Sequence, residues 1–163
     1  MNAIDTSALV YDRTSGAYYN ASDLNRVAEF CETVVSSAIA EIANIAAMRA
    51  TYGVAPSPYS LPDYTVTAIT VKKDFVRTDT YTAAQLTRYL QNANYVIGKF
   101  PPAARKNMPE VMRFLTYLSA NNIEENLKLS AENLVARSNV TEKNIVNTAA
   151  AFCYAGEIYG GEI

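Results

Sequence analysis

With 163 residues, half of them apolar and 18% charged, the chain has the size and composition of one soluble domain with its own hydrophobic core. Its formal net charge of −2 and its scattered lysines and arginines argue against a nucleic-acid-binding protein, which usually carries a basic surface. The absence of histidine removes the commonest general base and the commonest transition-metal ligand, so Ser/His/Asp and Cys/His catalytic sites are excluded.

Other signs of chemistry are also missing from the sequence. The two cysteines, Cys31 and Cys153, lie far apart without metal-ligand spacing, and we expect both to be reduced thiols. No glycine-rich phosphate loop precedes a predicted helix. We therefore expect no enzyme activity, no cofactor and no metal site. Residues 1–5 lack the positive start and apolar run of a secretion signal, which predicts a protein made in the cytoplasm without a signal peptide.

Two pairs of carboxylates are candidates for acid–base or calcium sites, Glu124 with Glu125 and Asp74 with Asp79. Adjacent residues of a helix point to different sides of it, and the second pair is too sparse for a calcium loop. Both pairs are interpreted as solvated surface charge.

The chain begins with a polar, Thr- and Ser-rich stretch, residues 1–17, that shows no periodicity. This stretch is predicted to be an extended N-terminal arm, which would either fray or dock on a neighbour. Residues 18–151 are predicted to form a helical domain. Residues 152–163 are predicted to form a separate C-terminal segment, rich in glycine and aromatic residues.

A first long helix is predicted over about residues 21–51. Asn20 is a favourable N-cap, Asp23 lies near the positive end of the helix dipole, and Gly53 is a stop signal. Apolar residues then recur every three and four positions, which predicts one core-facing stripe. The apolar run 34–48 is interrupted by polar residues and is shorter than the ~20 residues of a membrane span. We therefore expect a core helix and no membrane contact.

The middle of the chain is predicted to cross from one helix to another. Three prolines between residues 56 and 62 exclude a helix there. The β-branched, loosely alternating residues 64–72 predict a strand or extended crossover, paired with the C-terminus or with another subunit. A capping box formed by Thr82 and Gln85 begins a second helix, which ends before residue 101.

The last third of the chain is predicted to hold a short helix at about 108–115 and a long one at about 117–137, with a turn or new cap near residues 141–144. The tail 152–163 is predicted to be extended or hairpin-like. The expected fold is therefore mainly α. It is a helical bundle with two long amphipathic helices plus short extended or β segments at about 64–72 and in the C-terminal tail.

Polar residues interrupt two of the predicted helices: Asn25 and Arg26 in the first, and Asn121, Asn122 and Glu124 in the last. Amides inside helices lower helix propensity, so they usually mark a hydrogen-bonded contact or a solvated face. One interpretation is a polar register lock between the two long helices, with Arg26 paired to Glu124. The other interpretation is simple surface exposure.

Several segments resemble a known family. The segment from Tyr18 to Val27 resembles the YNYTDLNRVE signature of small tail-region proteins from phages and prophages of Gram-positive bacteria. Further segments resemble motifs of that family in the same order: Lys73-Asp74-Phe75, Arg88-Tyr89-Leu90-Gln91-Asn92, Leu115-Thr116-Tyr117 with Ala120-Asn121-Asn122-Ile123-Glu124, and Tyr154-Ala155-Gly156-Glu157-Ile158-Tyr159-Gly160-Gly161-Glu162. The chain departs from the family at Ala21, Ala28, Phe75 and Phe152, which weakens aromatic contacts but keeps the helix caps.

The resemblance implies a non-catalytic structural component of a phage or phage-derived tail, near the tail tip or baseplate, where adaptors join the tube to receptor-binding proteins. The implied partners are other tail and baseplate proteins and further copies of this chain in a ring, and the implied location is the virion. Interaction or register positions suggested by the motifs and helix patterns are Tyr18, Tyr19, Asn25, Arg26, Asp74, Phe75, Asn121, Asn122, Glu124, Tyr154, Glu157 and Tyr159.

The 12 tyrosines leave a second interpretation open, a carbohydrate- or receptor-binding module. Tyrosine offers a large flat contact area with few rotatable bonds, so it suits sugar stacking as well as packing. Loops are where such a platform would form. The tyrosines predicted to lie in loops are Tyr11, Tyr18, Tyr19, Tyr59 and Tyr64.

Overall fold

The computed structural model describes residues 1–56, 65–78 and 80–159 of the chain. It contains three α-helices, α1 (Ala21–Tyr52), α2 (Ala83–Lys99) and α3 (Tyr117–Tyr159), and a short 3-10 helix, η2 (Met112–Phe114). The described ranges contain no β-strand. The predicted mainly helical fold is therefore confirmed, and its two longest helices are α1 and α3.

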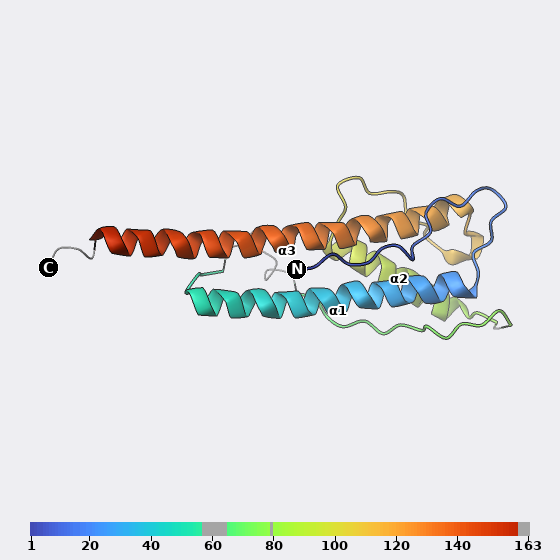
Figure 1. Ribbon diagram of the computed structural model, residues 1–163. Helices are drawn as coiled ribbons and strands as arrows, with labels where there is room; N and C mark the ends of the chain where they lie inside the picture. Colours follow the sequence, from blue (N-terminus) through green and yellow to red (C-terminus); the bar gives the residue numbers. More distant parts are fainter. Residues whose placement is uncertain (57–64, 79, 160–163) are drawn as a thin grey trace.

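The three helices run in the same direction, and the long connections between them return the chain to the starting end (Figure 1). α1 and α3 lie side by side in a constant register. Arg26 contacts Glu124 and Asn44 contacts Glu142, both across a separation of 98 residues, and Glu41 contacts Ser138 across 97. Because that spacing aligns the end of α1 with about residue 150, the last two turns of α3 extend beyond α1.

α2 packs against the first half of both long helices, so three helices meet at one end of the bundle and only two at the other (Figure 1). The apolar residues of the three helices form one continuous core. Its fully buried members include Val27, Cys31, Val34, Ala38, Ile45, Ala93, Val96, Ile97, Ile123, Leu127 and Leu134. Spacing by three and four placed these residues on one face of each helix, as the sequence predicted.

The N-terminal arm docks on its own chain. Residues 1–17 run back along α1 and α3, against the direction of the helices (Figure 1). Leu9 is buried in the core, and the Met1 amino group lies 2.9 Å from Glu142 Oε1 on α3. The arm therefore belongs to the helical domain, because its apolar and charged groups are used inside that domain.

The predicted starts of α1 and α2 are confirmed by their caps. Asn20 accepts from the backbone of Ser22 and Asp23, and the Asp23 carboxylate accepts in turn from the Asn20 N–H. Thr82 and Gln85 make the same reciprocal pair at the start of α2. Gly53 ends α1 with a φ of 64°, a conformation that glycine adopts without steric cost.

The C-terminal third differs from the prediction in three places. The short helix at 108–115 is only the 3-10 turn Met112–Phe114, whose N-terminus has no side-chain cap. No turn occurs at 141–144, where Thr141 Oγ1 donates to the Arg137 carbonyl inside α3. Residues 152–159 are helical and not extended, and 160–163 lie outside the described residues. Burial of Ile145 beside α1 and the helix-forming alanines 149–151 continue the helix.

The predicted strand at 64–72 is also not confirmed. Residues 65–72 are neither strand nor helix, and residue 64 lies outside the described residues. Thr67 N donates to Tyr95 Oη at 2.8 Å, and Asn92 Nδ2 donates to the Thr70 carbonyl at 2.9 Å. Val66 and Ile69 pack against the core. This segment therefore lies against helices, whose side chains supply the bonds that a neighbouring strand would supply.

α1 is long and apolar enough to cross a membrane by length and composition. The core helix of a soluble protein has the same properties, and one face of α1 is packed against α2 and α3. Its buried side chains include charged ones, Asp23, Glu41 and Arg49. These contacts agree with the interpretation of α1 as a core helix.

Candidate functional site

Four charged side chains form a buried network where α1 and α3 begin. Arg13 comes from the N-terminal arm, Asp23 and Arg26 from α1, and Glu124 from α3. Arg13 Nη2 lies 2.8 Å from Asp23 Oδ1 and 2.6 Å from Glu124 Oε1. Arg26 Nη2 lies 2.6 Å and 2.8 Å from the same two oxygens. The predicted pair of Arg26 with Glu124 is present, within a larger network.

The network is electrically neutral and almost fully hydrogen-bonded. Two guanidinium groups face two carboxylates, and Glu124 has no exposed surface. Glu124 Oε2 accepts from the Val10 N–H at 2.7 Å and from Arg26 Nε at 3.2 Å. Buried charges are tolerated only when they are paired and hydrogen-bonded, and each carboxylate here meets that condition. The interpretation of Glu124 as surface charge was therefore wrong.

The surroundings shift the pKa of three groups in the network, and each shift favours the charged form of that group. Burial alone would raise the pKa of Asp23, but the Asn20 N–H and the two guanidinium groups outweigh burial and lower it. Burial alone would lower the pKa of Arg13 and Arg26, but the two carboxylates outweigh burial and raise it. These shifts favour the charged forms of Asp23, Arg13 and Arg26, which suits a structural role in the ion-pair network.

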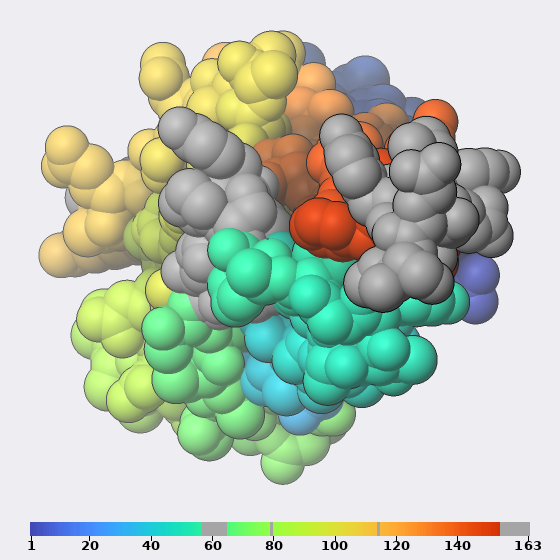
Figure 2. Space-filling model, turned by 90° about the vertical axis from the view of Figure 1, so that its left-hand side faces the viewer, coloured from blue at the N-terminus to red at the C-terminus, as the bar shows by residue number. Residues whose placement is uncertain are grey.

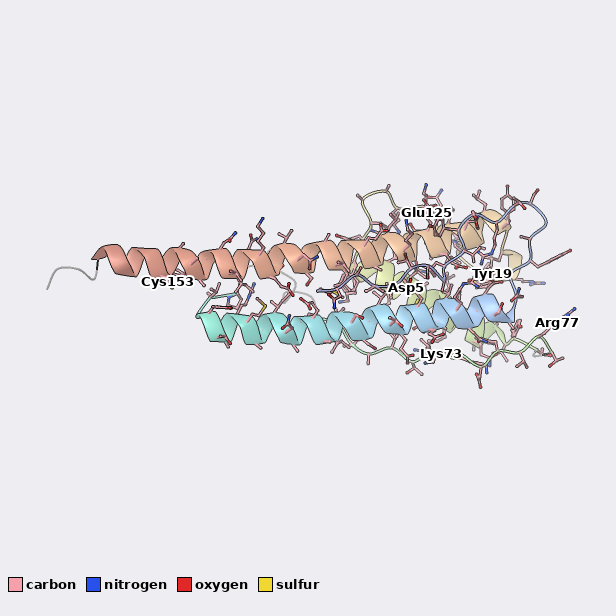
Figure 3. The ribbon with its side chains drawn as sticks, viewed as in Figure 1. Asp5, Tyr19, Lys73, Arg77, Glu125 and Cys153 are labelled. Carbon is pink, nitrogen blue, oxygen red and sulfur yellow. The ribbon has the colours of Figure 1, made fainter. Side chains whose placement is uncertain are left out.

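Tyr19 lies between the charge network and α2 and contacts both. Its hydroxyl hydrogen-bonds with the Tyr89 hydroxyl, and the two rings meet edge to face with centroids 6.4 Å apart. The Arg13 guanidinium lies 5.1 Å from the centroid of the Tyr19 ring. Tyr19 lies at the end of the bundle where the helices begin (Figure 3). Burial is the main cause of a raised pKa in both tyrosines.

Three asparagines each hold the backbone of one residue in a non-helical segment. The amide oxygen of the asparagine accepts from the backbone N–H, and its amide nitrogen donates to the carbonyl of the same residue. We call these pairs the asparagine clamps. They are Asn25 with Phe75, Asn121 with Arg13, and Asn126 with Lys106, and every distance lies between 2.8 and 3.1 Å.

Further asparagines make single bonds of the same kind. Asn92 donates to the carbonyl of Thr70, Asn122 to that of Asn107, and Asn133 to that of Pro101, each at 2.8 or 2.9 Å. Buried backbone groups need partners, and these loops have no strand to supply them. Together with the clamps, these bonds attach the arm and both long connections to the helices.

The other predicted positions differ in their surroundings. Phe75 is buried and meets Tyr81 edge to face, whereas Asp74 is exposed and pairs with Lys72. Tyr18 is 89% exposed. Tyr154, Glu157 and Tyr159 lie in the last turns of α3, with side chains outside the described residues. The loop tyrosines Tyr59 and Tyr64 also lie outside them.

The sequence interpretation missed the two residues that complete these arrangements. Arg13 lies in a segment without periodicity, so nothing local indicated that its side chain is only 6% exposed. Asn126 was not distinguished from other polar residues of its helix. A buried glutamate needs more than one positive or donor group, and that requirement is the signal that could have prompted a search for Arg13.

A second carboxylate pair lies farther along the same two helices. Glu41 accepts from the Ser138 hydroxyl and lies near Glu142, which accepts from the Met1 amino group at 2.9 Å. Burial, with Glu142 nearby, raises the pKa of Glu41, whereas the Met1 ammonium lowers that of Glu142. Within the described part of the chain, no three His, Cys, Asp or Glu side chains gather as a metal site.

No protein-family model, curated protein or solved structure matches this chain.

Proposed function

We propose that this protein is a non-catalytic structural component of a phage or phage-derived tail, acting as an adaptor near the tail tip or baseplate. The observation that carries the proposal is the internal use of the polar signature residues. Asp23, Asn25, Arg26, Asn121 and Glu124 all lie in the segments that resemble the tail proteins, and all bind other parts of this chain.

That observation supports the proposal in two steps. Residues that build a fold recur together in chains that share the fold, because losing one leaves a buried partner unsatisfied. The signature residues are then, in our proposal, the residues that build this clamped helical bundle. The five polar signature residues named above are all bound to groups of this chain, which suits a rigid part of an assembly more than a reactive site.

In this role the bundle contributes protein–protein contacts to a symmetric assembly that contains further copies of the chain. Rings of identical subunits require contacts that close under rotation. The signature residues are mostly buried and hold the molecule rigid, so the contacts belong to surfaces away from the charge network. The proposed partners are other tail and baseplate proteins, and the proposed location is the virion.

The test is the presence of the chain in particles. Tailed particles are purified from the encoding strain by sedimentation, analysed by mass spectrometry, and labelled with gold-conjugated antibody against this chain. We expect the label at one end of the tail. A strain with a stop codon in the gene should produce particles without a complete tail tip, and a plasmid copy should restore it. Complete, infective particles without the chain would refute the proposal.

The exposure of Tyr18 favours one alternative, a module that binds carbohydrate or a receptor. Tyr18 is 89% exposed, although it belongs to the signature. Tyr19 is paired with Tyr89 inside the bundle, and the ring of Tyr11 lies 5.3 Å from the Lys128 ammonium. Both rings therefore contact other side chains of this chain, and Tyr18 is the ring on which this alternative depends. Retention of the protein on a glycan column, lost in Tyr18→Ala and kept in Tyr117→Ala, would support this alternative.

A further inference from the structure

A pocket lies between α1, α2 and the non-helical segment 65–76. Its volume is about 330 Å³, and the described residues that line it come from all three of these parts. The segment, drawn in green, runs along α1 in Figure 1, and Figure 2 shows it at the surface beside α1. Asn25 holds the segment at Phe75, and Asn92 holds it at Thr70, so the fold keeps the walls of the pocket in place.

The walls of the pocket suit a flat ring. Ala28 on α1, Phe75 in the segment and Tyr89 on α2 line it, and each is at most 6% exposed. Two of these three side chains are aromatic, and aromatic rings pack favourably edge to face or in offset stacks. The volume lies near the lower end of the range for ligand pockets, which is about 300–1,000 Å³. The pocket therefore fits one aromatic ring with small substituents.

An unpaired acceptor lines the pocket. Asn92 Nδ2 donates to the Thr70 carbonyl at 2.9 Å, whereas Asn92 Oδ1 has no hydrogen-bond partner among the described residues. Asn122 and Asn133 also make single bonds, but they are half-buried, so water reaches them. Asn92 is only 8% exposed, and a buried acceptor is costly to leave unpaired. A ligand in the pocket can donate to this oxygen.

A free positive charge lies one helical turn from Asn92. Arg88 lines the pocket and is exposed, and its guanidinium makes no ion pair or hydrogen bond with the described residues. Lys72 also lines the pocket, but its ammonium is paired with Asp74. The described lining contains no carboxylate. The unpaired charge at the pocket is therefore positive, and it favours an anionic group.

We propose that this pocket binds a small aromatic acid that carries a hydrogen-bond donor on the opposite side of its ring. Arg88 binds the acid group at the surface, Phe75 and Tyr89 contact the ring, and Asn92 Oδ1 accepts from the donor. The rise from Arg88 to Asn92 along α2 is ~6 Å, which is close to the length of a para-substituted benzene ring. This binding goes beyond the proposed function, because the pocket is formed within one chain and needs no assembly.

The first experiment titrates isotope-labelled protein with para-hydroxyphenylacetate and follows the backbone amide signals by NMR. We expect saturable shifts at Phe75, Tyr89 and Asn92 and none at Val140 in the far half of α3. The expected Kd is about 10 μM to 1 mM, which is ordinary for a ligand of this size. Phenylacetate lacks the hydroxyl and should bind about three- to tenfold more weakly, because Asn92 Oδ1 then has no donor.

The second experiment tests the charge. Arg88→Gln should weaken the binding of para-hydroxyphenylacetate about tenfold, because a hydrogen bond between charged groups is lost. It should leave the affinity for tyrosol nearly unchanged, since tyrosol has an alcohol in place of the carboxylate. Arg105→Gln is the matched control, because Arg105 is also exposed but does not line the pocket. This control should bind both probes like the wild type.

The third experiment reduces the volume of the pocket. Ala83 and Ala84 are both exposed in the first turn of α2, but only Ala84 lines this pocket. Ala84→Leu should weaken the binding of para-hydroxyphenylacetate and of tyrosol at least about threefold, because the larger side chain takes up part of the space. Ala83→Leu should bind both probes like the wild type. Leucine is a good helix former, so both variants should keep the fold.

Several outcomes would overturn the inference. One is the absence of saturable shifts at millimolar para-hydroxyphenylacetate, which would leave water as the partner of Asn92. Others are shifts only outside the pocket, equal affinities for para-hydroxyphenylacetate and phenylacetate, or equal effects of Arg88→Gln and Arg105→Gln or of Ala84→Leu and Ala83→Leu. All these measurements use the isolated chain. Failure to bind would therefore refute this inference alone, and absence of the chain from particles would refute the proposed function alone.

Discussion

Arg26 and Glu124 join the two long helices through two parallel contacts. Arg26 Nη2 lies 2.8 Å from Glu124 Oε1, and Arg26 Nε lies 3.2 Å from Glu124 Oε2. The fork of a guanidinium matches both oxygens of a carboxylate, which makes such pairs specific in geometry as well as in charge. The pair lies in the same register of 98 residues as Asn44 with Glu142, so it marks the alignment of α1 with α3.

The first prediction is that Arg26→Ala and Glu124→Ala are strongly non-additive in the free energy of unfolding. Each change leaves a buried charge without one of its partners, so we expect each to cost about 3–5 kcal/mol. The double variant should cost less than the sum, because no buried partner of that pair remains. Urea denaturation of the four proteins measures the coupling.

The matched control is the exposed pair of Lys106 with Glu125, whose charged atoms lie 3.4 Å apart. Its double-mutant cycle should give a much smaller coupling, because water screens exposed ion pairs. Additive losses for Arg26 and Glu124 would show that the pair does not act as a unit.

The second prediction concerns the asparagine clamp between Asn25 and Phe75. Asn25→Ala removes two hydrogen bonds, and we expect a loss of about 1–3 kcal/mol in stability. The amide of Phe75 should then exchange with deuterium faster, since the segment around it has no strand to hold it. Asn122→Ala removes a single exposed bond and should leave exchange at Phe75 unchanged. Equal exchange in both variants would argue against a clamp.

The third prediction concerns alkaline pH. Burial raises the pKa of Tyr19 and Tyr89 above the ordinary value of 10.0. Their contribution to stability is therefore complete below about pH 10 and is lost as the pH rises, because the unfolded chain ionises first. In a titration of phenolate absorbance, Tyr19 and Tyr89 should ionise only when the protein unfolds. Tyr19→Phe and Tyr89→Phe should each reduce that late step by one tyrosine.

The fourth prediction concerns acid. The pKa of Asp23 is lowered in the folded protein, below its ordinary value of 3.8. Its contribution to stability is therefore present above that value and is lost as the pH falls through the folded-state pKa. Urea midpoints measured between neutral pH and strong acid should decline more steeply for the wild type than for Asp23→Asn. Asp12→Asn, at an exposed residue of the arm, is the matched control for the same change of side chain.

Local patterns in the sequence predicted the parts of this fold that local physics controls. Asn20, Thr82 and Gln85 cap helices through atoms within three residues of each other, so their roles can be read without tertiary information. The end of α3 could not be predicted from such local patterns. α3 continues through residues 141–144 because Ile145 is buried on the far side of that region, a contact that no local pattern reports.

In the charge network, too, some residues could be predicted from local patterns and others only from tertiary contacts. Two polar positions in different helices suggested the pair of Arg26 and Glu124 as one of two interpretations, and the structure places those side chains together. Arg13 could not be found in this way, because its partners lie 10 and 111 residues away and its own segment has no period. The position of Arg13 depends on its contacts with α1 and α3, which exist only after those helices have packed together.

By itself, the sequence determined the helical class, the starts of α1 and α2, the core-facing stripes and the absence of histidine chemistry, because composition, caps and periodicity act over a few residues. Only the tertiary structure decided that the helices run in the same direction, that the arm returns to complete a neutral buried network, and that α3 extends past α1. These features depend on contacts between residues about 100 positions apart, and a local pattern contains no information about such partners.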